Sequence, residues 1–322
     1  MTDLPTTRST QRGTVLVTGA AGFLGSRVVA LLSASGAYDV IASDVDAGQR
    51  AHELQAMPAV TFVPLELRDD AAVAEVVAGA DYVVHLAALR SKVSQAGGRA
   101  PFDVNVAATY TLASAAGANG VKGFVYGSSH LVYGRFADPA RWFSEEDATP
   151  SPGLSLYAAA KLASESFVAA FSDAFGFDYV ALRFGGIYGP QAAPGSNTSV
   201  MTEILACIDR GEKPVVSWTR DTKHCLIYVD DAARAVVKAL EFRTRGTAVN
   251  VVNRPRTAEL IYSALVRLYG ADPSVLEWAA TKSRYQQVTD ARLTHKLQSP
   301  PATSLEEGLG SIIDWHRATR GH

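Results

Sequence analysis

A glycine-rich turn near the start of the chain constrains its fold more than any other feature. A β-branched run at 14–18 stops at Gly19, further glycines follow at Gly22 and Gly25, and an apolar helical pattern begins at Phe23. A strand, a tight turn and a helix in this order let the backbone approach a pyrophosphate, which then lies on the N–H groups and positive dipole of the helix. The spacing is G-x-x-G-x-x-G rather than G-x-G-x-x-G, so the glycines alone are also compatible with a purely structural turn.

Strand-like and helix-like patterns alternate after this turn. Short β-branched and apolar runs are each followed by alanine-rich helical stretches. This alternation predicts an α/β fold, a doubly wound parallel sheet covered by helices on both faces. We expect strands at 14–18, 38–44, 60–66, 81–87, 123–128 and 179–184, and helices at 24–34, 70–78, 103–118 and 157–175.

The pattern changes after Phe184. The loop-like segment at 185–199 is long enough to be a binding element or a lid. We expect helices near 198–210 and 230–242, the second capped by Asp230 or Asp231. Residues from about 253 onward predict a smaller mixed lobe.

Composition excludes several classes of protein. The chain has 322 residues with 30 basic and 32 acidic side chains, and no basic block indicates binding to nucleic acid or to an anionic membrane. No apolar run reaches the roughly 18 residues that a membrane span needs. The first dozen residues are polar and contain no secretory core. The two cysteines, Cys207 and Cys225, are unpatterned, which favours a reducing, cytoplasmic setting and no metal site.

Tyr157 and Lys161 stand four residues apart at the start of a strong helical run. Residues at i and i+4 share a helix face, and an ammonium beside a phenol lowers the phenol pKa from about 10 toward neutrality. Such a tyrosine can exchange a proton with a secondary alcohol or ketone. The same spacing is also common in exposed helix pairs, so it needs support from other motifs.

That support comes from Ser128 and Ser129, which end the strand predicted at 123–128. This is the edge of the sheet where doubly wound folds place ligands, and a hydroxyl there can bind a substrate oxygen. Serines also end strands for ordinary turn reasons. A glycine turn, a terminal serine and a helical Tyr/Lys pair, in this order, are together specific.

With these motifs the chain resembles the short-chain dehydrogenase/reductase superfamily, and within it the extended branch, the NAD-dependent epimerase/dehydratase family. The resemblance runs from residue 15 to about 309. It implies a tail at 1–12, an NAD-binding Rossmann domain at 13–184 plus about 226–252, and a substrate-binding lobe at about 185–225 and 253–322. The matching segments are 18–25, 85–88, 128–134, 157–161, 182–190, 227–231 and 304–309.

The resemblance implies hydride transfer between NAD and a small-molecule substrate. Tyr157, as phenolate, would take the hydroxyl proton while Ser129 holds the oxygen. Lys161 would lower the pKa of Tyr157 and bind the nicotinamide ribose. Relatives often form homodimers through the Tyr/Lys helix, and the run at 158–171 would permit this, as would ordinary core packing.

The choice of cofactor rests on Asp44, which ends the second predicted strand. A carboxylate there accepts hydrogen bonds from the adenosine ribose and repels a 2′-phosphate, which favours NAD over NADP. Arg50 is six residues away, and a solvated turn aspartate is the alternative interpretation. The predicted cofactor contacts are Gly19, Gly22, Phe23, Leu24, Gly25, Asp44, Glu66, Leu67, Leu86, Ala87, Ala88, Asn105, Tyr157, Lys161 and Phe184.

Glu66-Leu67 replaces the Asp-Leu pair common in the family, and Asn105 is equally suited to open a helix. His85 and His130 have structural or supporting roles in our interpretation, since no His/Cys/Asp cluster accompanies them to bind a metal. The predicted substrate contacts are Ser129, His130, Tyr157, Gly186 and His224.

Three anchors for a sugar-nucleotide diphosphate, expected from the resemblance, are missing. Gly186 replaces an asparagine, His224 replaces an arginine with Lys223 beside it, and Gln286 replaces another arginine with Arg284 nearby. A diphosphate needs charge-assisted hydrogen bonds, so these losses weaken the nucleotide-sugar hypothesis without excluding it.

Three hypotheses follow. The first is an NAD-dependent dehydrogenase acting on a secondary alcohol of a small sugar-like or sugar-acid-like molecule. The second is a nucleotide-sugar 4-epimerase with tightly bound NAD. Dehydration is disfavoured, because relatives use an acid/base pair after the serine where this chain has His130 and Leu131. The third, a non-catalytic NAD-binding regulator, would not need Tyr157 as an acid/base.

Overall fold

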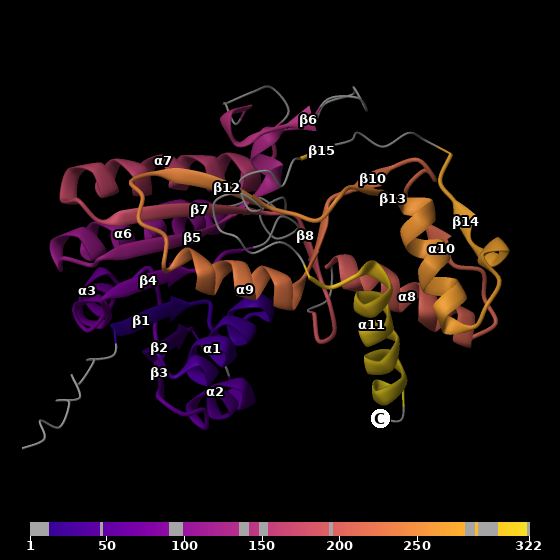
Figure 1. Cartoon of the computed structure of the whole chain (residues 1–322), viewed down its shortest axis with the longest axis horizontal. Coiled ribbons are helices and arrows are strands. Elements are labelled where there is room, and N and C mark those ends of the chain that lie inside the picture. Colours follow the sequence, from indigo (N-terminus) through magenta and orange to yellow (C-terminus); the bar gives the residue numbers. More distant parts are fainter. Residues whose placement is uncertain are drawn as a thin grey trace, which may run out of the picture.

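Seven parallel strands form the central sheet of the computed structural model (Figure 1), which confirms the predicted fold class. The structure describes residues 13–45, 48–89, 99–134, 142–147, 154–192, 196–280, 287–288 and 302–320. The strand order is β12-β7-β5-β4-β1-β2-β3. The strands are β1 (Gly13–Thr18), β2 (Tyr38–Asp44), β3 (Val60–Pro64), β4 (Tyr82–His85), β5 (Gly123–Ser129), β7 (Asp178–Phe184) and β12 (Thr247–Val251).

The order of the strands fixes where a ligand can bind. The chain winds outward from β1 through β2 to β3 and then returns to β4 on the other side of β1, where Thr18 pairs with His85. A crevice therefore opens beyond the carboxyl ends of β1 and β4, at the point where the winding reverses. The glycine turn follows β1 directly, so it lies at this crevice.

Helices cover both faces of the sheet (Figure 1). Alternate strand residues point to opposite faces, so Val15 and Val17 pack in one apolar cluster with α1 and α9, and Leu16 packs in another with α3, α6 and α7. The helices around the sheet are α1 (Phe23–Ser35), α2 (Gly48–Gln55), α3 (Asp70–Ala78), α5 (Ala100–Phe102), α6 (Ala108–Ala118), α7 (Leu156–Phe175) and α9 (Val229–Ala239).

Several predicted boundaries differ from the structure. The third strand ends at Pro64, because the chain turns where Asp69 N donates to Glu66 O at 3.0 Å. The helix predicted at 103–118 begins with the one-turn helix α5 and a π-helical segment, η1 (Asp103–Ala107), before α6. The helix α2 and the edge strand β12 were not predicted.

The predicted cap of α9 is wrong. The helix begins at Val229 with Tyr228 as the N-cap residue, and Asp230 and Asp231 lie in its first turn. The Asp231 carboxylate instead accepts backbone N–H groups from Ala302 at 2.9 Å and Thr303 at 3.1 Å. It ties the segment before the last helix to the sheet domain.

A second apolar core lies beside the carboxyl edge of the sheet, on the right of Figure 1. Within the segment expected to be a loop, β8 (Gly186–Tyr188) pairs in parallel with β11 (Leu226–Tyr228). The predicted tail at 1–12 lies outside the described residues. The other elements here are α8 (Asn197–Asp209), β9 (Val215–Val216), β10 (Lys223–His224), β13 (Arg256–Thr257), α10 (Ala258–Tyr269), η4 (Pro273–Val275), β14 (Glu277–Trp278) and α11 (Leu305–Thr319). The short strand β15 (Gln287–Val288) pairs in parallel with β6 (Trp142–Phe143).

Among the described residues, no helix is both long and apolar enough to cross a membrane.

Candidate active site

The glycine turn has no room for side chains. Gly19 has a φ of +72°, and a Cβ there would lie 2.6 Å from the backbone nitrogen of Ala87. A Cβ at Gly25 would overlap the carbonyl oxygen of Gly19. Gly22, at the N-cap of α1, offers no side-chain cap to the first N–H groups of the helix. The turn therefore presents bare backbone and a helix N-terminus to the crevice, as a pyrophosphate requires.

Asp44 lies beside this turn, at the end of β2. Its carboxylate accepts hydrogen bonds from the backbone nitrogen of Ala21 at 3.1 Å and of Val45 at 2.9 Å. Arg50 also reaches the turn and donates to the carbonyl oxygen of Ala21 at 3.0 Å. Asp44 is thus held at the rim of the crevice, where it can accept hydrogen bonds from a ribose.

A cavity of about 690 Å³ extends from the glycine turn to the second core. It brings together most of the site residues predicted from the sequence, although these come from distant parts of the chain. The predicted residues that line it are Gly19, Gly22, Phe23, Leu24, Gly25, Leu86, Ala88, Ser129, His130, Tyr157, Lys161, Phe184, Gly186 and His224.

Five predicted residues lie outside the cavity wall, and Asp44 and Ala87 are two of them. Glu66 is engaged by Arg68 at 2.6 Å, a hydrogen bond that lowers the pKa of the Glu66 carboxyl. Leu67 is buried in the core on the α3 side of the sheet. The side chain of Asn105 bonds both backbone groups of Leu89, at 2.7 and 2.9 Å. Asn105 therefore shapes the segment after β4.

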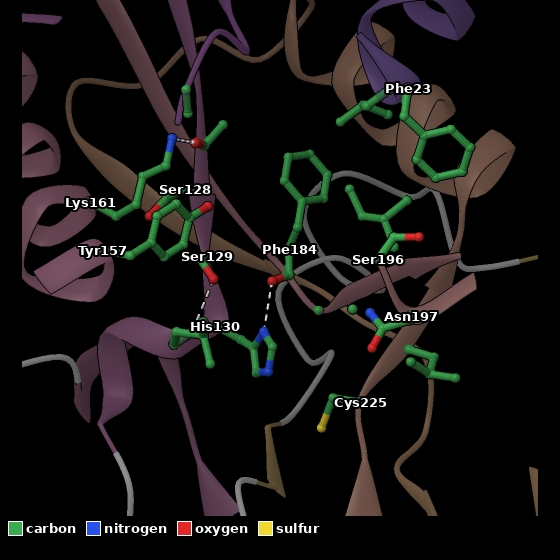
Figure 2. A pocket seen from close by; sticks show the side chains of 18 of the residues that line it. Phe23, Ser128, Ser129, His130, Tyr157, Lys161, Phe184, Ser196, Asn197 and Cys225 are labelled. Carbon is green, nitrogen blue, oxygen red and sulfur yellow. Dashed lines mark hydrogen bonds between the residues drawn. The ribbon is translucent and has the colours of Figure 1, made fainter. Parts of the chain in front are cut away.

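Ser129, Tyr157 and Lys161 come together at one side of the cavity (Figure 2). Ser129 ends β5, and its hydroxyl accepts the N–H of Leu131 at 3.2 Å at the start of η2 (His130–Tyr133). Tyr157 and Lys161 lie in the first two turns of α7, which Ser155 caps. The Lys161 ammonium donates to the carbonyl oxygen of Gly127 at 2.6 Å and lies 5.9 Å from the Tyr157 ring centre.

The lowered tyrosine pKa that we expected is absent from this structure. Burial raises the pKa of Tyr157 to about 12. Burial also lowers the pKa of Lys161 to about 7, an effect that the carboxylate of Glu165 opposes. The prediction considered the phenol and the ammonium alone, whereas the fold also removes both groups from water, and that penalty is larger here.

The three histidines at or near the site fall into two groups. His85 is fully buried between Thr18 Oγ1 at 2.7 Å and Thr109 Oγ1 at 2.9 Å, and burial lowers its pKa to about 3, with a smaller effect of Lys161. This confirms its structural role. Within the described parts of the chain, no cluster of three or more His, Cys, Asp or Glu side chains is arranged to hold a metal ion.

His130 and His224 line the substrate side of the cavity. His130 Nδ1 bonds the carbonyl oxygen of Phe184 at 2.9 Å, and burial lowers its pKa. His224 lies on β10, and burial lowers its pKa to about 4, so it is neutral near pH 7. Its Nε2 is buried and has no hydrogen-bond partner among the described residues. A polar substrate atom at this wall would give it one.

The structure adds two residues that the sequence analysis missed. A Cβ at Gly186 would overlap the side-chain amide of Asn197, the first residue of α8. Asn197 thus occupies the space that an asparagine at 186 would fill. Trp218 also lines the cavity and stacks on Tyr262, with 5.9 Å between the two ring centres. No sequence motif pointed to either, because their placement depends on how α8 and the following strands fold back.

Comparisons with known proteins identify the family of the chain. The family model described as the NAD dependent epimerase/dehydratase family matches residues 15–253. The chain is 32% identical over 321 residues to a dTDP-glucose 4,6-dehydratase of Streptomyces griseus, and the match covers 95% of this chain and 94% of the relative.

Solved structures give the same result. A dTDP-glucose 4,6-dehydratase from Streptomyces venezuelae with NAD bound matches with a TM-score of 0.82 at 27% identity, covering 95% of this chain and 98% of that one. A UDP-glucose 4-epimerase from Thermus thermophilus in complex with NAD matches with a TM-score of 0.81 at 27% identity, covering 95% and 99%. These matches span both the sheet and the second core.

Proposed function

The chain belongs to the NAD dependent epimerase/dehydratase family and binds NAD, and from this premise we propose that it oxidises a secondary alcohol of a nucleotide sugar and reduces the ketone again. The observation that carries the proposal is the convergence of Ser129, Tyr157 and Lys161 on a cavity that continues to the glycine turn. The net reaction is epimerisation when the hydride returns to the opposite face of the carbonyl carbon, and the hydride removed and the hydride added then balance.

The residues of the crevice fit NAD. The turn at Gly19 and Gly25 leaves no room for a Cβ, and the N-terminus of α1 is free of side-chain caps. Asp44, held beside this turn, would accept hydrogen bonds from the adenosine ribose. NAD, when bound, supplies the hydride acceptor and, in the reverse direction, the donor. Phe23 and Leu24 line the crevice beside the turn.

In this proposal each catalytic side chain moves or holds a proton. Ser129 donates its hydroxyl hydrogen to the substrate oxygen, and Tyr157 takes the hydroxyl proton. Because burial raises the pKa of Tyr157 to about 12, proton removal near pH 7 needs a nearby positive charge. Lys161, one helical turn away, is the residue that supplies it.

A nucleotide-sugar substrate is supported by the relatives, which match along almost the whole chain. Asn197 adds to this support, since its amide restores a hydrogen-bonding group where Gly186 has none. The sequence alone ranked a plain dehydrogenase first, and these observations reverse that order. The substrate-binding lobe, at about 185–225 and 253–322, would hold the nucleotide.

Epimerisation is a better match to the site than dehydration. Removing water from a sugar needs an acid and a base besides the tyrosine. His130 is held by the Phe184 carbonyl and kept neutral by burial, and Leu131 cannot ionise. The relative at 32% identity is named a dehydratase, but these two positions argue against that reaction here.

A dehydrogenase acting on a small, non-nucleotide alcohol is the second candidate. Among the described residues of the cavity wall, Lys161 and Lys223 are the cations, no arginine is present, and His224 is neutral. A diphosphate would gain few charge-assisted hydrogen bonds from this wall. A substrate with one or no negative charge suits it better.

One experiment separates these candidates. Purified protein is incubated with NAD and a panel of free sugars, aldonic and uronic acids, polyols, and UDP- and dTDP-sugars. NADH absorbance is followed, and the same reactions are resolved by chromatography. Conversion of a nucleotide sugar to its 4-epimer without NADH accumulation supports the proposal. Stoichiometric NADH with a small alcohol overturns it in favour of the dehydrogenase, and loss of turnover without loss of NAD binding in Tyr157→Phe rules out a non-catalytic protein.

A further inference from the structure

A buried ion pair lies directly behind the Tyr157/Lys161 pair. Glu165 is on the same helix as Lys161, one turn further on, and Arg183 is on β7. Arg183 Nη2 and Glu165 Oε2 are 2.7 Å apart, and Arg183 Nε donates to Oε1 at 3.0 Å. The two side chains are only 6% and 9% exposed. Charges this deeply buried are costly unless they are well partnered, so their presence needs a reason.

The Glu165–Arg183 ion pair is hydrogen-bonded to the end of β5. Ser128 donates its hydroxyl hydrogen to the Glu165 carboxylate. On one side of Ser128 is Gly127, whose carbonyl oxygen accepts the Lys161 ammonium at 2.6 Å. On the other side is Ser129, whose hydroxyl lines the cavity. Glu165 therefore fixes the residue between the two β5 groups that the active site uses.

Further hydrogen bonds from Arg183 hold the ion pair in place. Arg183 Nη1 donates to the Tyr133 hydroxyl at 3.1 Å and to the carbonyl oxygen of Glu145 at 2.8 Å. Tyr133 in turn donates to Asn250 Oδ1 at 2.6 Å. Arg183 thus bonds both oxygens of the Glu165 carboxylate and two groups outside the cavity wall, while Glu165 also accepts the Ser128 hydroxyl.

Glu165 is the anion among the titratable groups described around Lys161. Tyr126 on β5 has its ring 4.7 Å from the ammonium, and burial raises its pKa, so it is neutral. His85 on β4 is neutral because its pKa is lowered to about 3. Tyr157 is a neutral phenol in this structure, because burial raises its pKa to about 12. The Glu165 carboxylate opposes the loss of the Lys161 proton that burial favours.

We propose that Glu165 is a positioning residue for the hydride-transfer reaction, which holds Ser128 and so the β5 end in place and keeps the buried Lys161 charged. This inference rests on the proposed function, because it assigns Lys161 the task of stabilising the Tyr157 phenolate. Glu165 itself does not line the cavity and acts only through Ser128 and Lys161.

The test measures the ionisation of Lys161 directly. The side-chain Cε resonance of Lys161 is titrated by NMR in the full chain without NAD, in wild type and in Glu165→Gln, with Lys161→Met assigning the signal. Removing the carboxylate should lower the Lys161 titration midpoint by about one pH unit or more, the size expected for a nearby opposite charge. An unchanged midpoint in a folded variant overturns the proposal.

Turnover gives the second readout. Without the Glu165 charge, Lys161 loses its proton at lower pH and Tyr157 ionises at higher pH, so the pH range of activity should narrow from both sides. A merely structural role would lower kcat equally at every pH, and that result contradicts the proposal. If no substrate is turned over by the wild type, the proposed function fails while the NMR titration still decides this inference.

Two further variants guard against misfolding and general effects. Glu165→Gln leaves Arg183 unpaired and can fail to fold. The double variant Glu165→Gln/Arg183→Gln removes both charges and should also lower the Lys161 midpoint, because the Glu165 carboxylate is the charge that raises the pKa of Lys161. Asp209→Asn is the control. The Asp209 carboxylate, on α8, is bonded by His316 at 2.8 Å and by Tyr269 at 2.5 Å, and its loss should leave the titration midpoint of Lys161 unchanged.

Discussion

Lys161 donates to the carbonyl oxygen of Gly127 at 2.6 Å, so the ammonium is tied to the end of β5. Its distance to the centre of the Tyr157 ring is 5.9 Å. The lysine thus links α7 to β5 and sets the spacing between the tyrosine on the helix and the serine on the strand. Its charge serves both the packing of these elements and the chemistry.

Replacing Tyr157 or Lys161 should abolish turnover without unfolding the protein. Tyr157→Phe removes the proton acceptor, and we expect kcat/KM to fall by about 10²- to 10⁴-fold, as for loss of a general acid/base. Lys161→Met should cost a similar factor, because Tyr157 then keeps its raised pKa. Initial rates with the substrate found in the panel, together with NAD binding by fluorescence, test this. Retained activity in Tyr157→Phe would refute the assignment.

The sequence was sufficient to predict the features that depend on local periodicity. The glycine turn at Gly19, the alternating strands and helices, and the shared face of Tyr157 and Lys161 follow from spacing along the chain. The edge strand β12, which follows α9, was not predicted. Its place in the sheet depends on pairing with β7, which no local signal encodes.

Features that depend on burial could not be read from the sequence. The raised pKa of Tyr157 reflects how much water the whole fold excludes. Glu165 and Arg183 both lie next to recognised motifs, yet their pairing depends on α7 packing against the sheet. Asn197 reaches Gly186 only because α8 begins beside β8.

Acid should destabilise the protein through His85. Its pKa is about 3 in the folded chain, against an ordinary value of 6.5, so between these values the unfolded chain binds a proton that the folded chain does not. Stability is therefore lost as the pH falls below 6.5, by up to about 1.4 kcal/mol per pH unit from this group. Urea unfolding at several pH values measures the slope.

The variant His85→Gln should flatten that slope by about one proton, although it lowers stability near neutral pH by removing bonds to Thr18 and Thr109. His52→Gln is the control, since His52 is exposed on α2. Equal slopes in wild type and His85→Gln would show that His85 is protonated in the folded chain.

The outer faces of α6 and α7 should form a homodimer interface. Tyr110 is 46% exposed and Phe167 40% exposed, and their ring centres are 5.4 Å apart. Phe171 extends this patch at 5.0 Å from Tyr110. An exposed aromatic cluster of this kind favours association. Light scattering after gel filtration should give a dimer, and Phe167→Glu should give a folded monomer.

Leu268→Glu is the matched control for this surface. Leu268 is similarly exposed, but it lies on α10, a helix that packs in the second apolar core. This variant should leave the dimer intact. A wild-type protein that is monomeric at all concentrations tested would exclude the interface.

The contact between Asn197 and Gly186 predicts that an asparagine at position 186 can replace the asparagine at position 197. Asn197→Ala should raise the KM for a nucleotide sugar about tenfold with little change in kcat, since one hydrogen bond to a charged or polar substrate group is worth roughly that factor. Because the Asn197 amide fills the space above Gly186, Gly186→Asn alone should clash with it.

The double variant Asn197→Ala/Gly186→Asn has room for the new amide and should recover most of the lost affinity. Thr202→Ala, on α8 but outside the cavity wall, should leave KM unchanged. Steady-state kinetics of the four variants decide this, and a double variant no better than Asn197→Ala would mean that the amide at this place does not bind substrate.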